Sequence, residues 1–516
     1  MFRRKGRCET SLFFVLSLHS VDFVVYLQKS NQTVSMNITK SVHSFMLIAA
    51  FLFYGCTQQK TANTLLHEYP KIFPDYHEVV IPPNIAPLNF MVEGVDEIFV
   101  EFHLDGKCCF SISCQDGIAD IPMDKWTDML GKARGKEIEI HVSTWGKEHP
   151  EGVKYLPFKV MVADEDIDNW ITYRLIEPGY QSWKQLGIYQ RDIRSFDEKV
   201  IVDNHTNTQT CLNCHSFANY SPNRMMFHAR GANGGTYIYK DGKLLKVNIE
   251  KIGLKKGASY PIWHPEGKLI AFSSNKTQQA FFDVGEQPLE VYDESSDLIF
   301  YDTETGEVFS DPRFLTSETM ETYPAWSPDG KWLYYSLAEA KSLPKEHRDM
   351  HYHLCRLSFD PSTRTFGEKV DTLYNASMHQ GSASYPRISP DGQYLLYTWA
   401  SHGTFPIWHK EADLKMMDLE NRVPLDVSVW NSEEADSYHA WSSNGRWIVF
   451  GSRRLDGRYT RLFIAYLDKS GKACRPFLLP QEDPRHHIWR MKSFNIPEFV
   501  KESVELPSTD FSLMAQ

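Results

Sequence analysis

Four similar segments recur in the second half of the chain, and they restrict the possible folds more than any other feature. Each begins with Ser or Thr followed by Tyr, reaches a tight-turn sequence such as Pro-Asp-Gly, and leads into a short apolar run. Pro presets φ and Gly accepts positive φ, so these sequences close turns between strands. A repeat of about 50 to 65 residues with several strands is typical of a propeller blade. The segments are residues 259–268, 322–331, 384–393 and 437–446.

A fifth, degenerate copy precedes these four. Residues 219–228 align with residues 325–334 but lack the turn glycine. Residues 234–239 and 241–245 supply two further expected strands, as a blade requires. We therefore predict a propeller over residues 206–495, with five or six blades depending on whether a strand of the preceding connector closes the ring.

The composition favours an all-β fold. The chain has 25 Tyr, 31 Phe, 29 Gly and 27 Pro, whereas helix-favouring runs are scarce. Aromatic residues favour strands, and Gly and Pro close the turns between them. A chain of 516 residues is long enough for two or three domains. The formal net charge of −11 argues against a nucleic-acid partner, which would need a basic face.

Residues 71–165 are predicted to form a separate β-sandwich. Apolar and polar residues alternate at 97–102, 137–142 and 158–162, as in strands with one buried face. A helix is expected at 124–132. Short strands separated by turns resemble immunoglobulin or fibronectin type III modules. No group of chemically active residues stands out, so we expect a spacer or a partner-docking module.

The sequence Cys-Leu-Asn-Cys-His at residues 211–215 has the spacing of a covalently attached c-type haem. In that chemistry each thiol bonds a haem vinyl group and the histidine is the proximal ligand of the iron. A thioredoxin-like pair would need a βαβ unit, and a zinc site would need a second ligand pair; neither is visible nearby. A disulfide is a further alternative. We predict one covalent haem c bound by Cys211, Cys214 and His215, immediately before the first strand of the first blade.

A sixth iron ligand is expected from the strand that follows. Met and His are the usual residues at this position. On a strand Met225 shares a face with Phe227, whereas Met226 shares the other face with His228. The ligand is therefore Met225, or else Met226 or His228, and Met226 is the first choice. The alternative is that both methionines pack between blades.

Residues 166–205 form a connector that is rich in aromatic and charged residues, with strands expected at 171–176 and 198–202. Its arginines could meet haem propionates, because a guanidinium group pairs well with a carboxylate. Contacts with solvent or backbone are the alternative. These arginines are Arg174, Arg191 and Arg194.

The N-terminus carries an export signal. Lys40 precedes the apolar run at residues 45–53, which is too short to span a membrane comfortably and ends in Gly55-Cys56. Residues 36–55 resemble a bacterial lipoprotein signal, with Cys56 as the lipidated first residue of the mature chain. Phe53, three positions before Cys56, departs from the Leu that is usual at that position of such signals. An ordinary signal peptide cut elsewhere, or an uncleaved anchor, is the alternative.

Several boundaries follow from this signal. Residues 1–35 are a doubtful extension, residues 56–70 a tether and residues 496–516 a C-terminal tail. Haem attachment to C-x-x-C-H takes place outside the bacterial cytoplasm, so the two motifs agree on the compartment. We expect a lipid-anchored protein of the bacterial cell envelope. No acidic run follows Cys56, so we expect it to face the periplasm.

The repeats over residues 206–490 resemble the WD40-like (PD40) repeats of the TolB family. The whole pattern is similar to a bacterial group of TolB-like lipoproteins that carry Cys-x-x-Cys-His-Ser-Phe before the propeller. Residues 211–217 match that segment, and residues 438–450 and 453–457 match near the C-terminus. The resemblance implies a fold and a lipid anchor but says little about activity.

The remaining histidines and cysteines have simpler explanations. Several histidines lie in or near blade turns, where a structural or exposed role is the alternative to a site role, and His486-His487 could bind a metal or form a solvated turn. Cys109 and Cys114 could pair, but most of the other thiols are expected to be buried and free. The histidines are His264, His379, His402 and His439, and the other cysteines are Cys108, Cys355 and Cys474.

These motifs lead to one hypothesis and two alternatives. The first is an exported haem lipoprotein that moves or senses electrons at the envelope and exchanges them with a redox or scaffold protein partner. The second is a protein- or glycan-binding propeller whose haem is structural or vestigial. The third is a peroxidase-like enzyme with an open sixth position. We expect an electron-transfer or binding protein rather than an enzyme.

Overall fold

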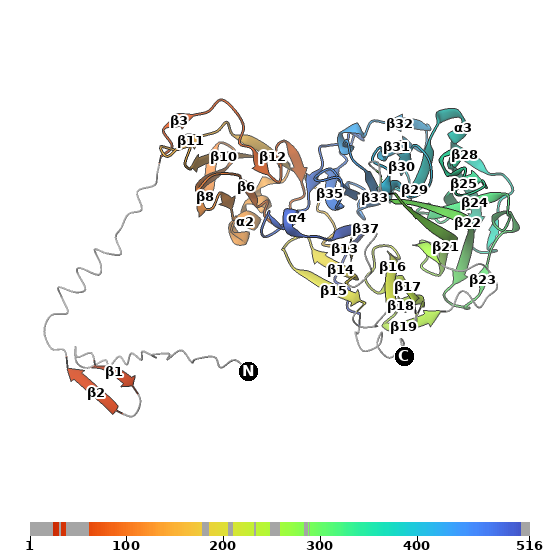
Figure 1. Cartoon of the computed structure of the whole chain (residues 1–516), viewed down its shortest axis with the longest axis horizontal. Coiled ribbons are helices and arrows are strands. Elements are labelled where there is room, and N and C mark those ends of the chain that lie inside the picture. Colours follow the sequence, from red (N-terminus) through yellow and green to blue (C-terminus); the bar gives the residue numbers. More distant parts are fainter. Residues whose placement is uncertain are drawn as a thin grey trace. The chain divides into compact units, whose positions relative to one another are not determined.

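The computed structural model describes residues 24–29, 32–37, 61–177, 185–204, 210–231, 234–247, 258–282, 287 and 289–506 (Figure 1). The chain divides into two compact units, Met1–Thr61 and Ala62–Gln516. In the first unit the described part is one antiparallel hairpin, β1 Val24–Lys29 with β2 Gln32–Asn37. Cys56 and most of the predicted signal lie outside the described residues. No helix in the described part of the chain is long and apolar enough to cross a membrane.

The region predicted as a sandwich contains two sheets and a helix, α2 Met123–Ala133. The strands and the helix expected from the sequence are confirmed, whereas the immunoglobulin-like topology stays a prediction. In α2 the buried side chains follow the helical spacing of an amphipathic helix: Trp126, Met129, Leu130 and Ala133. The larger sheet contains β5 Val79–Ile81, β7 Glu97–Leu104, β8 Lys107–Gln115, β10 Glu137–Trp145, β11 Val153–Lys154 and β12 Phe158–Val162. It also contains β3 Thr64–Leu65, which pairs with β11, so part of the predicted tether belongs to this sheet. The smaller sheet contains β4 Ile72–Phe73, β6 Phe90–Val92 and β9 Ile118–Ala119.

Six antiparallel sheets follow in the described residues, and together they make the fold all-β and propeller-like. The first sheet contains β13 Trp170–Ile176, β14 Gly187–Asp192, β15 Glu198–Asp203 and the C-terminal β37 Ser493–Val500. The second contains β16 Thr210–Phe217, β17 Arg224–Gly231, β18 Gly235–Lys240 and β19 Lys243–Val247. The third contains β20 Ser259–Trp263, β21 Leu269–Phe281, β22 Leu289–Asp302 and β23 Val308–Phe309. The fourth sheet contains β24 Thr319–Trp326, β25 Trp332–Glu339, β26 His353–Asp360, β27 Thr365–Phe366 and β28 Asp371–Tyr374. The fifth contains β29 Ser382–Ile388, β30 Tyr394–Ala400, β31 Asp413–Asp418 and β32 Val423–Leu425. The sixth contains β33 Asp436–Trp441, β34 Trp447–Ser452, β35 Arg461–Tyr466 and β36 Phe477–Leu478.

The inner strands of these sheets form a closed cycle. Each contacts the next in the order β16, β20, β24, β29, β33 and β37, and β37 contacts β16. The C-terminal strand β37 pairs with β13 of the connector, so the two ends of this region share one sheet. The connector strands therefore belong to the cycle, and β37 spans the predicted boundary between residues 495 and 496.

The repeated turn explains why each inner hairpin forms. In the repeat at 322–331 the Ser327 hydroxyl donates to Asp329 and accepts from the Trp332 N–H at 2.9 Å, while Gly330 adopts φ +69°. The Ser and Asp side chains thus supply hydrogen bonds within the turn itself. Gly adopts the positive φ without strain because it has no Cβ. Two other repeats make the same bonds through Ser389 and Ser442. The strands expected after each turn are confirmed as β21, β25, β30 and β34.

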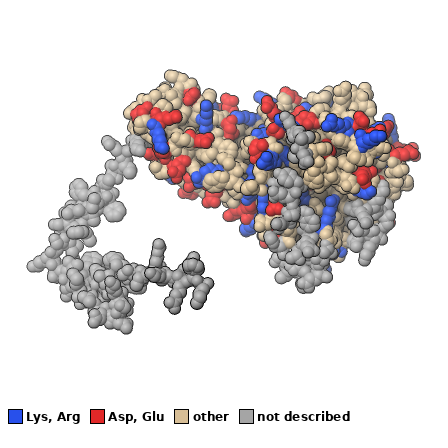
Figure 2. All heavy atoms as spheres, viewed as in Figure 1, with Lys and Arg blue, Asp and Glu red and all other residues tan. Residues whose placement is uncertain are grey.

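Apolar side chains on the facing sides of neighbouring sheets make the core. One such cluster joins Met226 and Ile238 of one sheet to Trp263 and Ile270 of the next. The indole N–H of Trp263 also donates to the carbonyl of Ser216 at 3.3 Å, which ties the two inner strands together. On the outer surface, acidic and basic side chains of the described residues are interspersed over the face in Figure 2. That pattern fits a solvated surface rather than a basic face.

Candidate functional site

A ring of buried side chains lies where the inner strands bulge. Six residues of one cluster, here called the central ring, come from these inner strands: the buried Tyr260, Tyr323, Tyr385, Tyr438 and Ile496 and the partly buried Cys214. Ile407, Phe405 and Trp408 pack in the same cluster. The tyrosines and the isoleucine have positive φ angles of 45° to 54°, which bulky residues rarely adopt. Adjacent tyrosine rings lie 4.1 to 5.6 Å apart between centroids. The strand registers place Asn213 of β16 at the position of the repeat tyrosine, so Cys214 lies one residue beyond it.

The C-x-x-C-H sequence lies within β16, the first strand of its sheet, and not before it as predicted. In β16 the pairing with β17 shifts between Leu212 and His215, which leaves Asn213 and Cys214 as a bulge. Because a bulge breaks the alternation of side chains, Cys211 and Cys214 both line one cavity of about 590 Å³. This volume lies within the range of small-molecule and cofactor sites, about 300 to 1,000 Å³. We call it the larger cavity.

His215 has different surroundings from the two thiols. Its side chain is 2% exposed and does not line the larger cavity. The imidazole Nε2 lies 3.2 Å from the Thr172 hydroxyl on β13. Burial, with a smaller contribution from the Arg174 charge, lowers the pKa of His215 to about 3, so the imidazole is neutral at physiological pH.

The three residues predicted as sixth ligands do not line the larger cavity either. Met225 and Met226 are fully buried on opposite faces of β17, each in a different apolar cluster between sheets. His228 lies with Nδ1 3.2 Å from the Thr236 hydroxyl, and burial lowers its pKa to about 3. Both methionines thus pack between neighbouring sheets, which was the alternative to iron ligation. Their role as iron ligands stays a prediction.

Four arginines line the larger cavity, Arg174, Arg230, Arg453 and Arg458, together with the carboxylates of Glu177 and Asp456. Arg174 donates to the Leu212 carbonyl at 3.0 Å and to the Asn213 side chain at 2.7 Å, so it also holds the bulge in place. Arg453 stacks on Trp408, with 4.2 Å between the guanidinium carbon and the ring centroid.

The other two connector arginines have structural partners. Arg191 is buried and donates to the Pro480 carbonyl at 2.6 Å and to the Gln481 side chain at 3.0 Å. Arg194 pairs with Asp192 at 2.7 Å. Of the three arginines singled out in the sequence, Arg174 alone lines the larger cavity.

These residues fit a haem in part. The paired thiols, the cavity volume and the four arginines suit a porphyrin with two propionates. Aromatic and apolar side chains of the wall suit its faces: Tyr260, Phe405, Ile407, Trp408, Tyr438 and Ile496. The His215 imidazole does not fit as it stands, because it is bonded to Thr172 outside the cavity wall.

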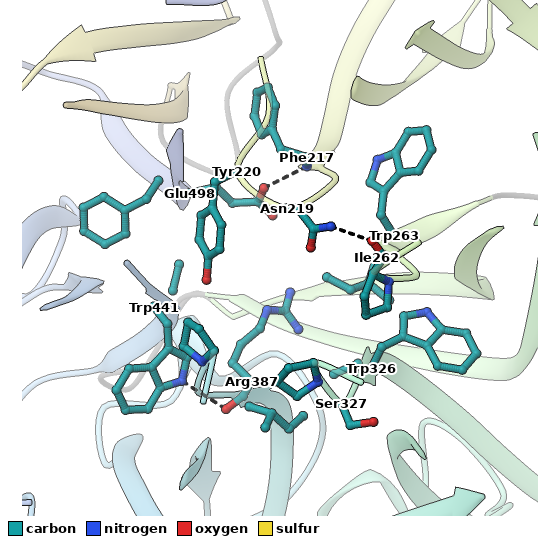
Figure 3. A pocket seen from close by; sticks show the side chains of 17 residues that line it. Phe217, Asn219, Tyr220, Ile262, Trp263, Trp326, Ser327, Arg387, Trp441 and Glu498 are labelled. Carbon is teal, nitrogen blue, oxygen red and sulfur yellow. Dashed lines mark hydrogen bonds between the residues drawn. The ribbon is translucent and has the colours of Figure 1, made fainter. Parts of the chain in front are cut away.

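A second cavity of about 300 Å³, here called the smaller cavity, is lined by inner-strand residues that lie two positions after the central ring, such as Ile262, Arg387 and Glu498 (Figure 3). Arg387 points toward its middle, and Glu498 lies at its edge. Burial raises the pKa of Glu498 to about 8, although the Arg387 charge and a 3.1 Å bond from the Phe217 N–H oppose that shift. Sequence reasoning missed Glu498. Aligning Asn-Ile-Pro-Glu-Phe at 495–499 with Ser-Tyr-Pro-Arg-Ile at 384–388 would have found it.

Most of the other histidines and cysteines have ordinary surroundings. His264, His439 and His487 each place Nε2 3.0 Å from a backbone carbonyl, and His379 is exposed. All cysteines in the described residues are free. Cys355 is buried as expected, but Cys108 and Cys109 are exposed, because they follow the turn of the β7–β8 hairpin. His402 differs, since it lies beside Glu290 and His409.

Comparison with known protein families finds no match, and comparison with curated proteins finds none either. Solved structures with β-propeller-like folds are similar to the chain. Oligogalacturonate lyase from Vibrio parahaemolyticus has 10% identity and a TM-score of 0.32, over 58% of this chain and 92% of that one. The periplasmic gluconolactonase of Pseudomonas aeruginosa has 14% identity and a TM-score of 0.32, over 61% and 97%. A puromycin-hydrolysing peptidase of Mycobacterium tuberculosis has 11% identity and a TM-score of 0.35, over 67% and 52%.

The central ring supports a first prediction, on the Tyr323→Phe variant. The Tyr323 hydroxyl donates to the Thr404 carbonyl at 2.6 Å, and both residues are buried. Removing the hydroxyl leaves a buried carbonyl unsatisfied, so we expect a loss of about 1 to 3 kcal/mol in the free energy of unfolding, measured by urea denaturation. Tyr385→Phe is the matched control, because among the described residues the Tyr385 hydroxyl has no hydrogen-bond partner. Equal losses in both variants would contradict the role of the Thr404 bond.

Proposed function

We propose that the chain is an exported lipoprotein that carries one haem c on Cys211 and Cys214 and moves or senses electrons at the bacterial cell envelope. The six sheets would be the blades of a TolB-like propeller that β37 closes. The observation that carries the proposal is that both thiols of the C-x-x-C-H sequence line the same cavity, which has the volume of a cofactor site.

The residues around the larger cavity would divide the work of holding the haem. The thiols would bond it covalently, and Arg174, Arg230 and Arg453 would pair with its propionates. The wall residues Tyr260, Trp408 and Tyr438 would cover the porphyrin and exclude water. A bound haem supplies one-electron chemistry between ferrous and ferric iron.

His215 would have to leave Thr172 and turn toward the cavity to serve as the proximal ligand. Its lowered pKa favours that role, because the neutral imidazole is the form that binds a metal. Recruiting Met226 would mean opening a packed cluster between two sheets. The absorption spectrum of the purified protein therefore tests whether the iron has a sixth ligand. A low-spin spectrum supports electron transfer, whereas a high-spin spectrum that responds to added ligands supports the peroxidase-like alternative.

The envelope location rests on the signal at residues 36–55 and on Cys56 as a lipidation site. Such an anchor would hold the propeller at a membrane surface, where a redox or scaffold protein could dock. The compartment is also the one in which thiols of this spacing receive haem. Radiolabelled palmitate incorporation tests the anchor, with Cys56→Ser as the variant that should lose the label.

The decisive experiment is expression of the full chain in a host with cytochrome c maturation, followed by a haem stain of the denatured protein. We expect one covalent haem per chain in the wild type and none in the Cys211→Ser/Cys214→Ser variant. The Cys108→Ser/Cys109→Ser variant is the matched control, because it removes two exposed thiols far from β16 in sequence, and it should retain the haem. A wild-type chain without covalent haem would overturn the proposal.

A second candidate function is supported by the position of His215. If that imidazole stays bonded to Thr172, the larger cavity is a binding site lined by aromatic rings and guanidinium groups without an iron ligand. Such a site suits an acidic glycan, since sugars stack on aromatic rings and carboxylates pair with arginine. Titration of the haem-free chain with acidic oligosaccharides should then quench tryptophan fluorescence, and Trp408→Phe should reduce that change.

A further inference from the structure

A second group of chemically active side chains lies outside the larger cavity. The ligand atoms of Glu290, His402 and His409 lie within 4.8 Å of one another, and we call these residues the Glu290 cluster. Glu290 is on β22, whereas His402 and His409 lie in the connection between β30 and β31. Glu290 and His409 are buried and His402 is nearly so. The cluster therefore joins two different sheets of the cycle.

The distances in the cluster are compatible with a shared metal ion. One Glu290 oxygen lies 3.3 Å from His409 Nε2, within hydrogen-bond reach, and the other lies 3.4 Å from His402 Nε2. In a tetrahedral zinc site with bonds of about 2.1 Å, neighbouring ligand atoms are about 3.4 Å apart. The two distances are close to that spacing.

A further histidine and a small cavity lie next to the cluster. His347, in the connection between β25 and β26, places Nε2 3.9 Å from a Glu290 oxygen. Glu290, His347 and His402 line a cavity of about 10 Å³, which has room for a single water molecule or ion. The buried His402 Nε2 has no hydrogen-bond partner among the described residues, so a donor atom faces this space unused.

Outer partners orient the cluster as they do around bound metals. His402 Nδ1 lies 2.8 Å from the Ser401 hydroxyl, and His409 Nδ1 lies 3.4 Å from Glu411. Gln287 donates to Glu290 at 2.9 Å. When the second ring nitrogen of a histidine is held in this way, the first is presented to the metal in a fixed tautomer and orientation.

We propose that Glu290, His402, His409 and His347 bind one divalent transition-metal ion of the zinc type. Imidazole and carboxylate are ligands that this class of ion prefers. The ion would join three sheets, because its ligands come from β22 and from two inter-strand connections. One of those connections also carries Phe405, Ile407 and Trp408, which line the larger cavity. The ion would thereby fix one wall of that cavity.

The test uses the full chain, stripped with a chelator and equilibrated against Zn²⁺ by dialysis. Bound zinc is counted by mass spectrometry, which separates it from any iron. We expect one zinc per chain and a rise in the thermal midpoint when zinc is added, because the ion binds only the folded state. The His402→Ala/His409→Ala variant should bind zinc at least about 100-fold more weakly and lose that rise, since even outer partners contribute about 10 to 100-fold.

Two further variants separate metal binding from folding and from other sites. Glu411→Gln alters only an outer partner, so it should fold normally and bind zinc about 10 to 100-fold more weakly. His103→Ala disrupts the partly exposed group of Glu101, His103 and Cys108, which also has metal-ligand spacing, and it should leave the zinc of the Glu290 cluster unchanged. A wild-type chain that binds no zinc, or one that loses it through His103→Ala, would overturn the proposal.

Discussion

A chain that ends at Lys492 should fail to fold, whereas a chain that ends at Leu506 should fold normally. The shorter chain lacks β37, which pairs with β13 and completes the cycle of inner strands. Among the described residues it loses five buried apolar side chains: Phe494, Ile496, Phe499, Val500 and Val504. Burying each contributes about 1.5 to 3 kcal/mol, so the total rivals the 5 to 15 kcal/mol of a whole domain.

Size-exclusion chromatography and the cooperativity of thermal unfolding measure the outcome. The chain ending at Leu506 is the matched control, because it keeps the pair of bonds between Gln190 and Val504 that follows β37. A soluble, cooperatively unfolding chain ending at Lys492 would show that the remaining sheets fold without closure of the cycle.

The Glu498→Gln variant should be more stable than the wild type at pH 8, and the difference should vanish near pH 4.5. Burial raises the pKa of Glu498 to about 8 in the folded chain, above its ordinary value near 4.5. The protonated carboxyl is therefore favoured on folding, and its contribution to stability is complete below pH 4.5. That contribution is lost as the pH rises toward 8, by up to about 1.4 kcal/mol per pH unit.

Glutamine keeps the neutral form at every pH and retains an oxygen for the Phe217 N–H. Because Glu498 is only partly buried in the smaller cavity, we expect a difference of about 2 to 4 kcal/mol at pH 8. Urea denaturation at pH 5, 6.5 and 8 measures it. Glu502→Gln, at an exposed position nearby, should follow the wild-type pH dependence. Parallel curves for Glu498→Gln and the wild type would show that Arg387 keeps this carboxyl ionised.

The repeats made much of the architecture predictable. A turn such as Ser327-Pro-Asp-Gly is satisfied by its own side chains, so a short sequence determines it without help from distant residues. Closure of the cycle was harder to predict, since β37 pairs with β13 more than 300 residues earlier. β37 has Ile496 where the repeats have Tyr, and no Pro-Asp-Gly turn follows it. The similarity of β37 to the inner strands of the repeats was therefore hidden in the sequence.

The candidate site was predictable only where local spacing carries the chemistry. The thiols of residues 211–215 were found in this way, and the bulge that turns both toward one cavity was not. The packing of Met225 and Met226 depends on sheets that face β17 from both sides, which no local pattern records. The Glu290 cluster joins residues more than a hundred positions apart, with no repeat or motif around them.

Closure by β37 also sets an order of events. The cycle is complete only after the last part of the chain has been synthesised, because its final strand belongs to the same sheet as β13. Until then β16 lacks its contact with β37, although β14 of the connector already contacts it. If Cys211 and Cys214 bind a haem as proposed, the group could be attached before Asn495 and Ile496 of β37 complete the wall of the larger cavity.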